Sequence, residues 1–304
     1  MDATLFDSFW ALFSSNKRLY WHFLLSSIFI ASIYLLVFKK ERRVNLTMKL
    51  WLHASALLDY KYFILSFFIK SLMILPVVVG INEVILFTYE YLLDHYGFVK
   101  ISIFSKTEVM FLFTFVLFVL SDFTRYWLHR LLHVVPWLWE FHKVHHSAKV
   151  LTPITFYRVH PIENILFGFR YSLVVGVVSG VFMYFFGAYI GLVEIVGANA
   201  FLYLFSLAGS NLRHSHIKLG YPKMIESICI SPHQHQLHHS SKYLNKNFGG
   251  YLAIWDTIFG TLQHSKNLSA IKIGIEDKSF VTLADILFVP FVKIYKKLRK
   301  KYVH

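Results

Sequence analysis

The chain has 304 residues, of which 56% are hydrophobic and 16% charged, and its 31 Lys and Arg against 17 Asp and Glu give a net charge of +14. A soluble protein this basic would normally be rich in charged residues, so the composition indicates a membrane protein and excludes a disordered chain. Cys229 is the only cysteine, which excludes a disulfide scaffold, iron–sulfur clusters and thiolate zinc sites.

Five stretches of the chain are apolar enough, and about long enough, to cross a bilayer as helices. They are residues 21–38, 62–81, 109–128, 165–186 and 188–208. The stretch 81–96 is apolar on one face only and carries Glu83, Glu90 and Asp94. It predicts an interfacial or re-entrant helix between the second and third crossings.

Basic residues indicate the orientation of these crossings. Five of them follow the first stretch between positions 39 and 49, so the positive-inside rule puts the N-terminus outside and residues 39–61 in the cytoplasm. Alternation then puts the chain after position 209 in the cytoplasm as well, and that part holds 14 of the 31 basic residues. We therefore expect a multi-pass protein of a bacterial inner membrane or the endoplasmic reticulum, with the first stretch as an uncleaved anchor and both histidine-rich regions on the cytoplasmic side.

Three parts of the chain are expected. Residues 1–107 form an N-terminal membrane region with two crossings and the interfacial helix, residues 108–265 hold the other crossings and the candidate catalytic histidines, and residues 266–304 form a basic cytoplasmic tail. Within the tail, the run 293–301 (KIYKKLRKK) is basic and amphipathic, which predicts contact with anionic lipid headgroups of the bilayer. A nucleic-acid partner is not expected, because nothing else on the chain suggests base stacking or groove reading.

Histidine is the compositional outlier, with 17 in the chain and twelve between His129 and His239. The clusters HRLLH, HKVHH and HQLHH place histidines three and four residues apart, on one face of a helix, so each cluster is expected to aim two or three imidazoles at one point. In LRHSHIKLG, His214 and His216 are two apart and diverge on a helix, and we favour His214 as the ligand. The nine expected metal ligands are His129, His133, His142, His145, His146, His214, His235, His238 and His239.

Nine imidazoles are too many for one metal ion, so two ions are expected. The pattern H-x-x-H-H should occur roughly 0.05 times by chance in such a chain, and it occurs twice. The alternative is a solvated polar face, but clustered imidazoles would repel one another when protonated, and a metal requires their neutral form. Imidazole suits iron, zinc, copper and nickel, so ligand type alone does not name the metal.

Six motifs in this order resemble the fatty acid hydroxylase and sterol desaturase superfamily of integral-membrane di-iron oxygenases, over about residues 121–262. They are SDFTRYWLHRLLH, WEFHKVHHS, RVHPIE, HSHIKLG, SPHQHQLHHS and NKNFGGYLAIWDTIFGTL. The last two are similar to the blocks of alkylglycerol monooxygenase-like and bacterial sterol desaturase proteins. The resemblance implies that the same nine histidines bind two irons.

The expected fold is all-α, a polytopic membrane helical bundle of four to five spans with a cytoplasmic helical cap that encloses a histidine-ligated dimetal site. The resemblance implies that the irons, O2 and electrons from a separate protein or a diffusible reductant hydroxylate or desaturate an unactivated C–H bond of a membrane lipid, an acyl or alkyl lipid or a sterol. No catalytic residue beyond the metal centre is expected, and zinc can replace the irons on overexpression. The alternatives are a non-enzymatic membrane carrier of zinc or iron and a lipid-binding scaffold.

Three further histidines are candidates for a metal ligand or for a partner of a ligand imidazole. His216 stands where related proteins often have Asn, His233 is an additional histidine, and His160 belongs to a His-Pro-x-Glu sequence that alkylglycerol monooxygenase lacks. These departures leave the substrate open and do not affect the nine expected ligands.

Two acidic residues are candidates for orienting the ligands. Asp122 lies two helical turns before His129 on the same face, where its carboxylate could accept an imidazole N–H or pair with Arg125. Asp256 is a candidate for a similar role, the alternative being a residue at a helix end or turn. Glu163 follows Pro161 at the start of an apolar stretch, which favours a capping role at a helix N-terminus.

Overall fold

The structure is a computed structural model that describes residues 13–302, except residues 16, 40–46, 71–79, 100, 188–189, 196–197 and 267–270. Its elements in chain order are α1 (Trp21–Val37), α3 (Met48–Trp51), α4 (Ala54–Ile69), α5 (Ile81–Tyr96), α6 (Lys106–Val134), α7 (Pro136–His146), η4 (Pro153–Tyr157), α8 (Pro161–Phe186), β1 (Glu194–Ile195), β2 (Ala198–Asn199), α9 (Ala200–Leu207), η6 (Ser210–His214), α10 (Lys223–Glu226), α11 (Pro232–His238), α12 (Ile254–Ile258) and α13 (Leu283–Tyr302).

The described part of the chain is helical, which confirms the predicted all-α class. The strands β1 and β2 are two residues each and pair antiparallel, with Glu194 opposite Asn199. They form a small hairpin at the edge of the helical arrangement and carry none of the candidate ligands.

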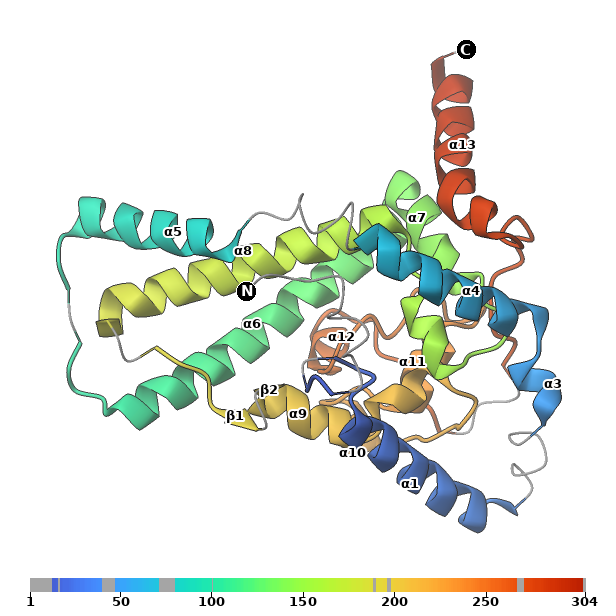
Figure 1. Cartoon of the computed structure of the whole chain (residues 1–304), viewed down its shortest axis with the longest axis horizontal. Coiled ribbons are helices and arrows are strands. Elements are labelled where there is room, and N and C mark those ends of the chain that lie inside the picture. The colour runs from blue at the N-terminus through green and yellow to red at the C-terminus, as the bar shows by residue number, and fades with distance from the viewer. Residues whose placement is uncertain are drawn as a thin grey trace.

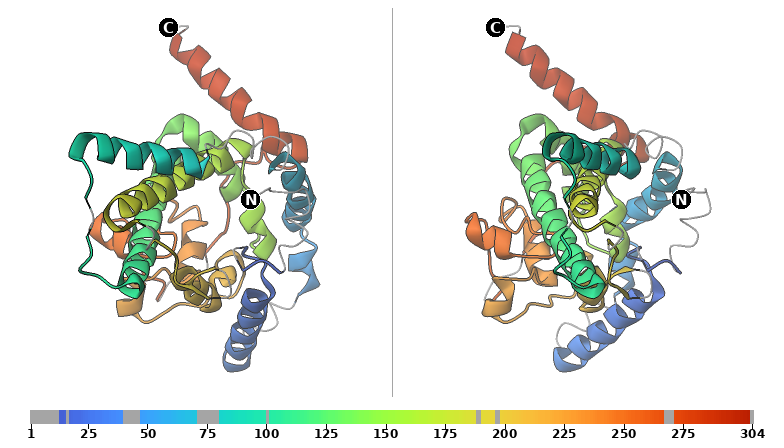
Figure 2. Two further views of the ribbon diagram at one scale, coloured as in Figure 1. Left: turned by 60° about the vertical axis from the view of Figure 1, so that its left-hand side comes forward. Right: turned by 90° about the vertical axis from the view of Figure 1, so that its left-hand side faces the viewer.

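Helices α5, α6 and α8 form an arm that extends away from the remaining elements (Figures 1 and 2). The helix α6 starts at a capping box in which Ser105 and Glu108 satisfy each other's backbone N–H groups, and α8 starts at Pro161. A buried apolar cluster that includes Phe113 and Phe182 holds α6 against α8. The chain therefore brings the C-terminal end of α6 and the N-terminal end of α8 to the same end of the arm.

The helix α5 packs closely on α8 because glycines face it. A Cβ placed on Gly176 would lie 2.4 Å from Cβ of Val84, and one on Gly180 would lie 2.6 Å from Cβ of Thr88. Small residues four apart let two helix backbones approach, a device that is common between membrane helices. The stretch expected to lie at the membrane interface is thus a helix in lengthwise contact with α8.

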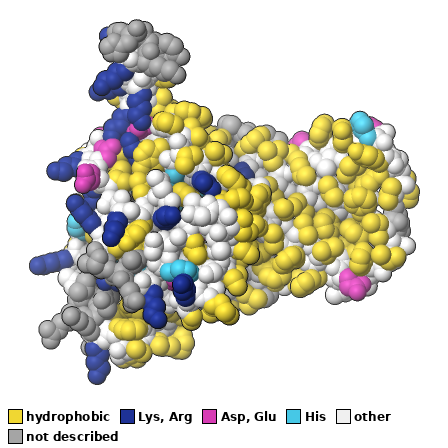
Figure 3. Space-filling view, turned by 180° about the vertical axis from the view of Figure 1, so that it is seen from behind, with side chains coloured by type: hydrophobic (Ala, Val, Ile, Leu, Met, Phe, Trp, Pro, Cys, Tyr) yellow, Lys and Arg dark blue, Asp and Glu magenta, His cyan; other side chains and the backbone are white. Residues whose placement is uncertain are grey.

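Two of the described helices, α6 with 29 residues and α8 with 26, are long and apolar enough to cross a membrane. They contain the predicted stretches 109–128 and 165–186. Hydrophobic side chains cover most of the arm in Figure 3, whereas Lys and Arg gather over the opposite end of the molecule. On α6, for example, Phe111 and Phe115 are exposed, as expected for side chains that face lipid.

The other predicted crossings have a different outcome. The first corresponds to α1, an apolar helix of 17 residues. The second begins on α4, and its positions 71–79 lie outside the described residues. The prediction of one helix over residues 188–208 is wrong, because this stretch holds the β1–β2 hairpin and the eight-residue helix α9.

The physical reason for this correction lies in the contacts of the segment with α6. The hydroxyl of Thr114 accepts from the backbone N–H of Val193 at 2.8 Å, and the side chain of Asn199 donates to the carbonyl of Thr114. Asn199 also accepts from the backbone N–H groups of Phe201 and Leu202, and so it starts a new helix at α9. Hydrophobicity alone does not report such a cap inside an apolar run.

The remaining elements pack around the inner end of α6 and α8. The turn η6 contacts α1, η4 and α11, and α7 contacts α6, α8 and α13. A second buried cluster joins Leu58 and Tyr62 of α4 to Val144 of α7 and to Phe280 and Ile286. Beyond this cluster α13 projects from the molecule (Figure 1).

Candidate metal centre

Nine histidines converge at the inner end of the arm in two groups. In group 1 and in group 2, one ring nitrogen of each member lies within 4.8 Å of one ring nitrogen of every other member. Group 1 consists of His129, His133, His142, His146 and His238, and group 2 consists of His145, His214, His235 and His239. These are the nine residues that the sequence predicts as ligands, and each group could hold a metal ion.

The spacing of each H-x-x-H-H cluster predicts that its imidazoles point to one position. In the structure, each cluster instead contributes to both groups. On α7, His142 and His146 belong to group 1 and His145 to group 2. In the second cluster, on α11 and its C-cap residue, His238 belongs to group 1, whereas His235 and His239 belong to group 2. On a helix the residue at i+4 lies about 40° from residue i, whereas i+3 lies about 60° away on the other side. Each cluster therefore spans both groups, and the rings of His146 and His239 stack with centroids 4.6 Å apart.

Group 1 contains two imidazole nitrogens that hydrogen bonding alone does not satisfy. Nδ1 of His129 donates to the carbonyl of Phe248 at 2.8 Å, and Nδ1 of His238 donates to the carbonyl of Lys246 at 2.8 Å. A carbonyl only accepts, so in the neutral rings both Nε2 atoms carry lone pairs. These two Nε2 atoms lie 3.0 Å apart, an arrangement that needs a cation between them.

Group 2 also contains imidazole nitrogens that hydrogen bonding alone does not satisfy. Nε2 of His214 lies 3.2 Å from Nε2 of His145, 3.1 Å from that of His235 and 3.2 Å from that of His239. A single N–H cannot satisfy three acceptors at once. Two imidazole nitrogens bound to one metal at about 2.1 Å are about 3.0 to 3.4 Å apart, and these distances match that spacing.

The histidines are buried, which favours their neutral form. Burial lowers the pKa of His142 to about 3, and burial followed by the nearby His142 lowers the pKa of His145 to about 4. Burial and the neighbouring histidines hold the pKa values of His146, His235 and His239 well below the usual range. Neutral imidazole is the form that binds a metal, so both groups fit divalent transition metals such as iron or zinc.

The candidate partners Asp122 and Asp256 act on a loop and make no direct contact with a ligand ring. Asp122 accepts from the backbone N–H groups of Tyr251 and Leu252 and from the indole of Trp255. Nδ1 of His129, the ligand two helical turns after Asp122, donates to the carbonyl of Phe248.

Asp256 accepts from the backbone N–H groups of Phe248 and Gly249 at 2.8 Å each and from the hydroxyl of Thr261. It thereby positions the Phe248 carbonyl that accepts from His129, so it orients a ligand through one intervening residue. Burial raises the pKa of the Asp256 carboxyl to about 6.

The three additional histidines lie outside both groups. His160 caps α8, where its Nδ1 accepts from the N–H of Ile162 and its Nε2 contacts the carbonyl of Leu287. Nδ1 of His233 contacts the side chain of Gln236 at 3.0 Å, and the ring of His216 meets the edge of Trp51. Their candidate role as metal ligands is therefore not supported by their positions.

Two buried interactions near the ligands were not predicted. Oε1 of Glu163 lies 3.0 Å from Nδ1 of His142, so Glu163 orients a ligand ring instead of only capping α8. Nη1 of Arg158 pairs with Oδ1 of Asp59 at 3.1 Å, while the carbonyl of Arg158 accepts from Nδ1 of His145. Neither contact leaves a local signal in the sequence, because Glu163 lies 21 positions from His142 and Asp59 lies 99 positions from Arg158.

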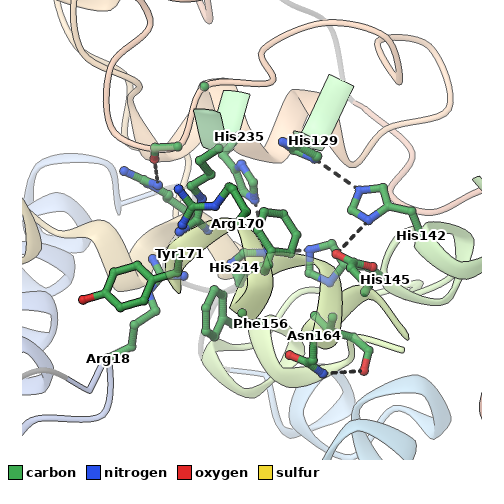
Figure 4. Close-up of a pocket in the computed structure, with 18 of the residues that line it drawn as sticks. Arg18, His129, His142, His145, Phe156, Asn164, Arg170, Tyr171, His214 and His235 are labelled. Carbon is green, nitrogen blue, oxygen red and sulfur yellow. Dashed lines mark hydrogen bonds and ion pairs between the residues drawn. The ribbon is translucent and has the colours of Figure 1, made fainter. Parts of the chain in front are cut away.

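A cavity of about 360 Å³ adjoins both groups, and His129, His142, His145, His214 and His235 line it. Figure 4 shows His142 and His145 at one side of this cavity and Arg18, Arg170 and Tyr171 toward the other. The cavity thus connects the candidate metal positions with a strongly basic wall.

Residues 114–261, about half of the chain, match the fatty acid hydroxylase family. The chain is 31% identical to ornithine lipid hydroxylase OlsE of Rhizobium tropici (53% of this chain, 44% of the relative), 28% to lathosterol oxidase of Mus musculus (47% and 42%) and 30% to alkylglycerol monooxygenase of Homo sapiens (47% and 28%). The matched part thus spans less than half the length of these relatives. No solved structure matches the chain significantly. The resemblance to the superfamily is confirmed over this part of the chain, which contains all nine histidines of the two groups.

Proposed function

Because residues 114–261 form a fatty acid hydroxylase domain, we propose that this protein is a membrane-bound di-iron oxygenase that uses O2 and external electrons to hydroxylate or desaturate a C–H bond of a lipid. The observation that carries this proposal is the pair of buried histidine groups, whose ring nitrogens face one another beside a single cavity. The names of the relatives, a lipid hydroxylase, a sterol oxidase and a monooxygenase, support oxidation of a lipid.

In this proposal His129, His133, His142, His146 and His238 would hold one iron, and His145, His214, His235 and His239 the other. The bound irons would supply the activation of O2 and the oxidation of the C–H bond. The protein contributes by fixing the ligand rings. The carbonyls of Phe248, Lys246 and Arg158 accept from Nδ1 of His129, His238 and His145 and so leave Nε2 of these rings as the ligand atom, while the carboxylate of Glu163 lies beside Nδ1 of His142.

Burial of the groups contributes a second effect. His146, His238 and His239 have no exposed surface, so bulk water does not compete for these positions. The substrate would enter through the cavity, which reaches Tyr171 on α8, a residue with 49% of its surface exposed. A lipid lying along the apolar face of α8 could thus reach the histidines from the membrane.

The membrane topology belongs to the same proposal. We place α6 and α8 across the bilayer, with the histidine end on the cytoplasmic side, because Lys and Arg gather at that end. The histidines occupy the C-terminal end of α6 and the shorter elements that follow it in the chain, whereas a metal carrier needs its ligands near the membrane midplane. A separate protein or a diffusible reductant would deliver the electrons.

Iron content tests the proposal. Full-length protein produced anaerobically with added iron is expected to hold about two irons per chain with a Mössbauer spectrum of nitrogen-ligated iron. The variant His145→Ala, His238→Ala removes one ligand from each group and is expected to lose both. Zinc alone, or no metal in protein that stays folded, would contradict the proposal and favour a carrier or a lipid-binding scaffold.

A further inference from the structure

The cavity beside the two histidine groups is lined by five cationic side chains and one carboxylate. The cations are Arg18, Lys70, Arg125, Arg170 and Arg213, and the carboxylate is Glu163. Glu163 already lies against the ring of His142. A cavity meant only for a hydrocarbon chain or a sterol ring would gain nothing from these charges, because bringing cations close together without an anion costs free energy.

The fold does not neutralise these cations with carboxylates. Among the described residues, none of the five forms an ion pair within 4.0 Å. Arg18 and Arg170 donate to backbone carbonyls, at Ser210 and Ser121. The carboxylate of Asp122, which is near Arg125, already accepts three N–H groups from the loop at 251–255. The cavity therefore retains an excess of positive charge.

Among these residues, Arg213 gives the strongest evidence that the cavity binds an anion. Its side chain is only 4% exposed, and Nη1 donates to the carbonyl of Gly250. Nε and Nη2, however, are buried and have no hydrogen-bond partner. An anion in the cavity would supply the missing hydrogen-bond acceptors and stabilise the charged guanidinium. A planar guanidinium with free N–H groups on two nitrogens suits a carboxylate or a phosphate.

The surroundings of the cavity indicate where the rest of such a ligand would lie. Phe156, Phe167 and Tyr171 line the same cavity. Tyr171 is 49% exposed on α8, so the cavity reaches the surface of this helix. Figure 4 shows Arg18, Arg170 and Tyr171 on the side of the cavity opposite His142. A headgroup held at these arginines could keep its chain against α8.

We propose that the cavity binds the anionic headgroup, a phosphate or a carboxylate, of a membrane lipid, and that Arg213, Arg18, Arg170, Arg125 and Lys70 neutralise it. This inference rests on the proposed oxygenase function and specifies its substrate class. Because the cationic wall and the histidines share one small cavity, the carbon presented for oxidation belongs to the polar end of the lipid and not to the far end of its chain.

Binding tests this inference without turnover. Full-length protein in detergent is mixed with equal amounts of dioleoyl phosphatidylglycerol and dioleoyl phosphatidylcholine, and native mass spectrometry counts the retained lipids. We expect clear preference for the anionic lipid. The variant Arg18→Gln, Lys70→Gln removes two cations that are only partly buried, and we expect it to reduce retention of the anionic lipid by about tenfold or more. The matched control Lys223→Gln, Lys242→Gln removes two exposed charges outside the cavity and should leave retention unchanged.

Two results would overturn the inference. One is equal retention of both lipids, or the same loss in both double variants. The other is complete displacement of the anionic lipid by millimolar glycerol 3-phosphate, which would show a site for a soluble anion. Iron per chain, measured on the same preparations, separates this failure from failure of the proposed function, because two irons without lipid preference would leave the oxygenase proposal intact.

Discussion

Oε1 of Glu163 lies 3.0 Å from Nδ1 of His142, and both side chains are buried. The contact joins the first turn of α8 to α7 and directs Nε2 of His142 toward His129 and His146. A helix that is long and apolar enough to cross the membrane thus contributes a carboxylate to the orientation of a candidate metal ligand. The geometry of the site and the position of α8 are therefore coupled at this residue.

Replacing Glu163 is expected to weaken metal binding without removing a ligand. Glu163→Gln keeps an oxygen that can accept from Nδ1 of His142 but loses the charge, and partners of this kind typically change metal affinity about 10- to 100-fold. Competition with a chelator measures the affinity of each variant. The control Glu83→Gln removes an exposed carboxylate on α5 and should behave as wild type. Unchanged affinity in Glu163→Gln would show that the contact does not serve the metal.

Metal removal should make the stability of the protein depend on pH. His142 and His145 have folded-state pKa values lowered to about 3 and about 4, whereas in the unfolded chain they protonate near pH 6.5. The unfolded state therefore binds more protons as the pH falls below about 6.5, and stability present above that pH is progressively lost toward pH 4. At pH 5 each of these two histidines should lower the free energy of unfolding by about 2 kcal/mol relative to neutral pH.

Thermal unfolding of chelator-treated protein between pH 7.5 and 5 measures this loss. His145→Asn should reduce the slope, because asparagine does not protonate, whereas replacing the exposed His95 by Asn should not. Metal-loaded protein should keep its thermal stability to a lower pH, since the metal competes with protons for the same nitrogens. A slope that is the same in all these samples would contradict the prediction.

The buried pair of Asp59 and Arg158 should be essential for folding around group 2. Thr155 also donates to Asp59 at 2.6 Å, so the pair fixes the turn whose carbonyl accepts from His145. Arg158→Met leaves an unpaired buried carboxylate and is expected to cost about 3 to 5 kcal/mol. Lys293→Met, which breaks a more exposed pair with Asp277, should cost about 0 to 1 kcal/mol. Denaturant unfolding in detergent compares the two, and similar losses would show that burial of the first pair is unimportant.

The sequence was most informative where the spacing of residues carries the chemistry. Eight of the nine candidate ligands could be named from helical spacing, which brings the histidines of one cluster near each other, whereas His214 had to be chosen over His216. The sequence analysis did not predict that His145 belongs to a different group from His142 and His146. The three residues differ by only about 40° and 60° around the helix, so their spacing alone does not show whether they bind one metal ion or two. Glu163 and the Phe248 carbonyl act across long sequence separations, and no local pattern reports such contacts. The hairpin within 188–208 depends on Thr114, which lies 79 residues before Val193.

The contact of α5 with α8 gives a prediction that combines substitution and rescue. Gly176→Ala places a methyl group 2.4 Å from Cβ of Val84, so the helices must separate, at a cost of about 1 to 3 kcal/mol. Val84→Gly removes that neighbour, and the double variant should be more stable than the sum of the single changes predicts. The control pair is Gly176→Ala with Phe87→Gly, because Phe87 is 70% exposed on α5 and its effect should simply add. Thermal unfolding of all variants measures the coupling energy, and simple additivity for Gly176 with Val84 would show that the glycine is not needed for this close approach.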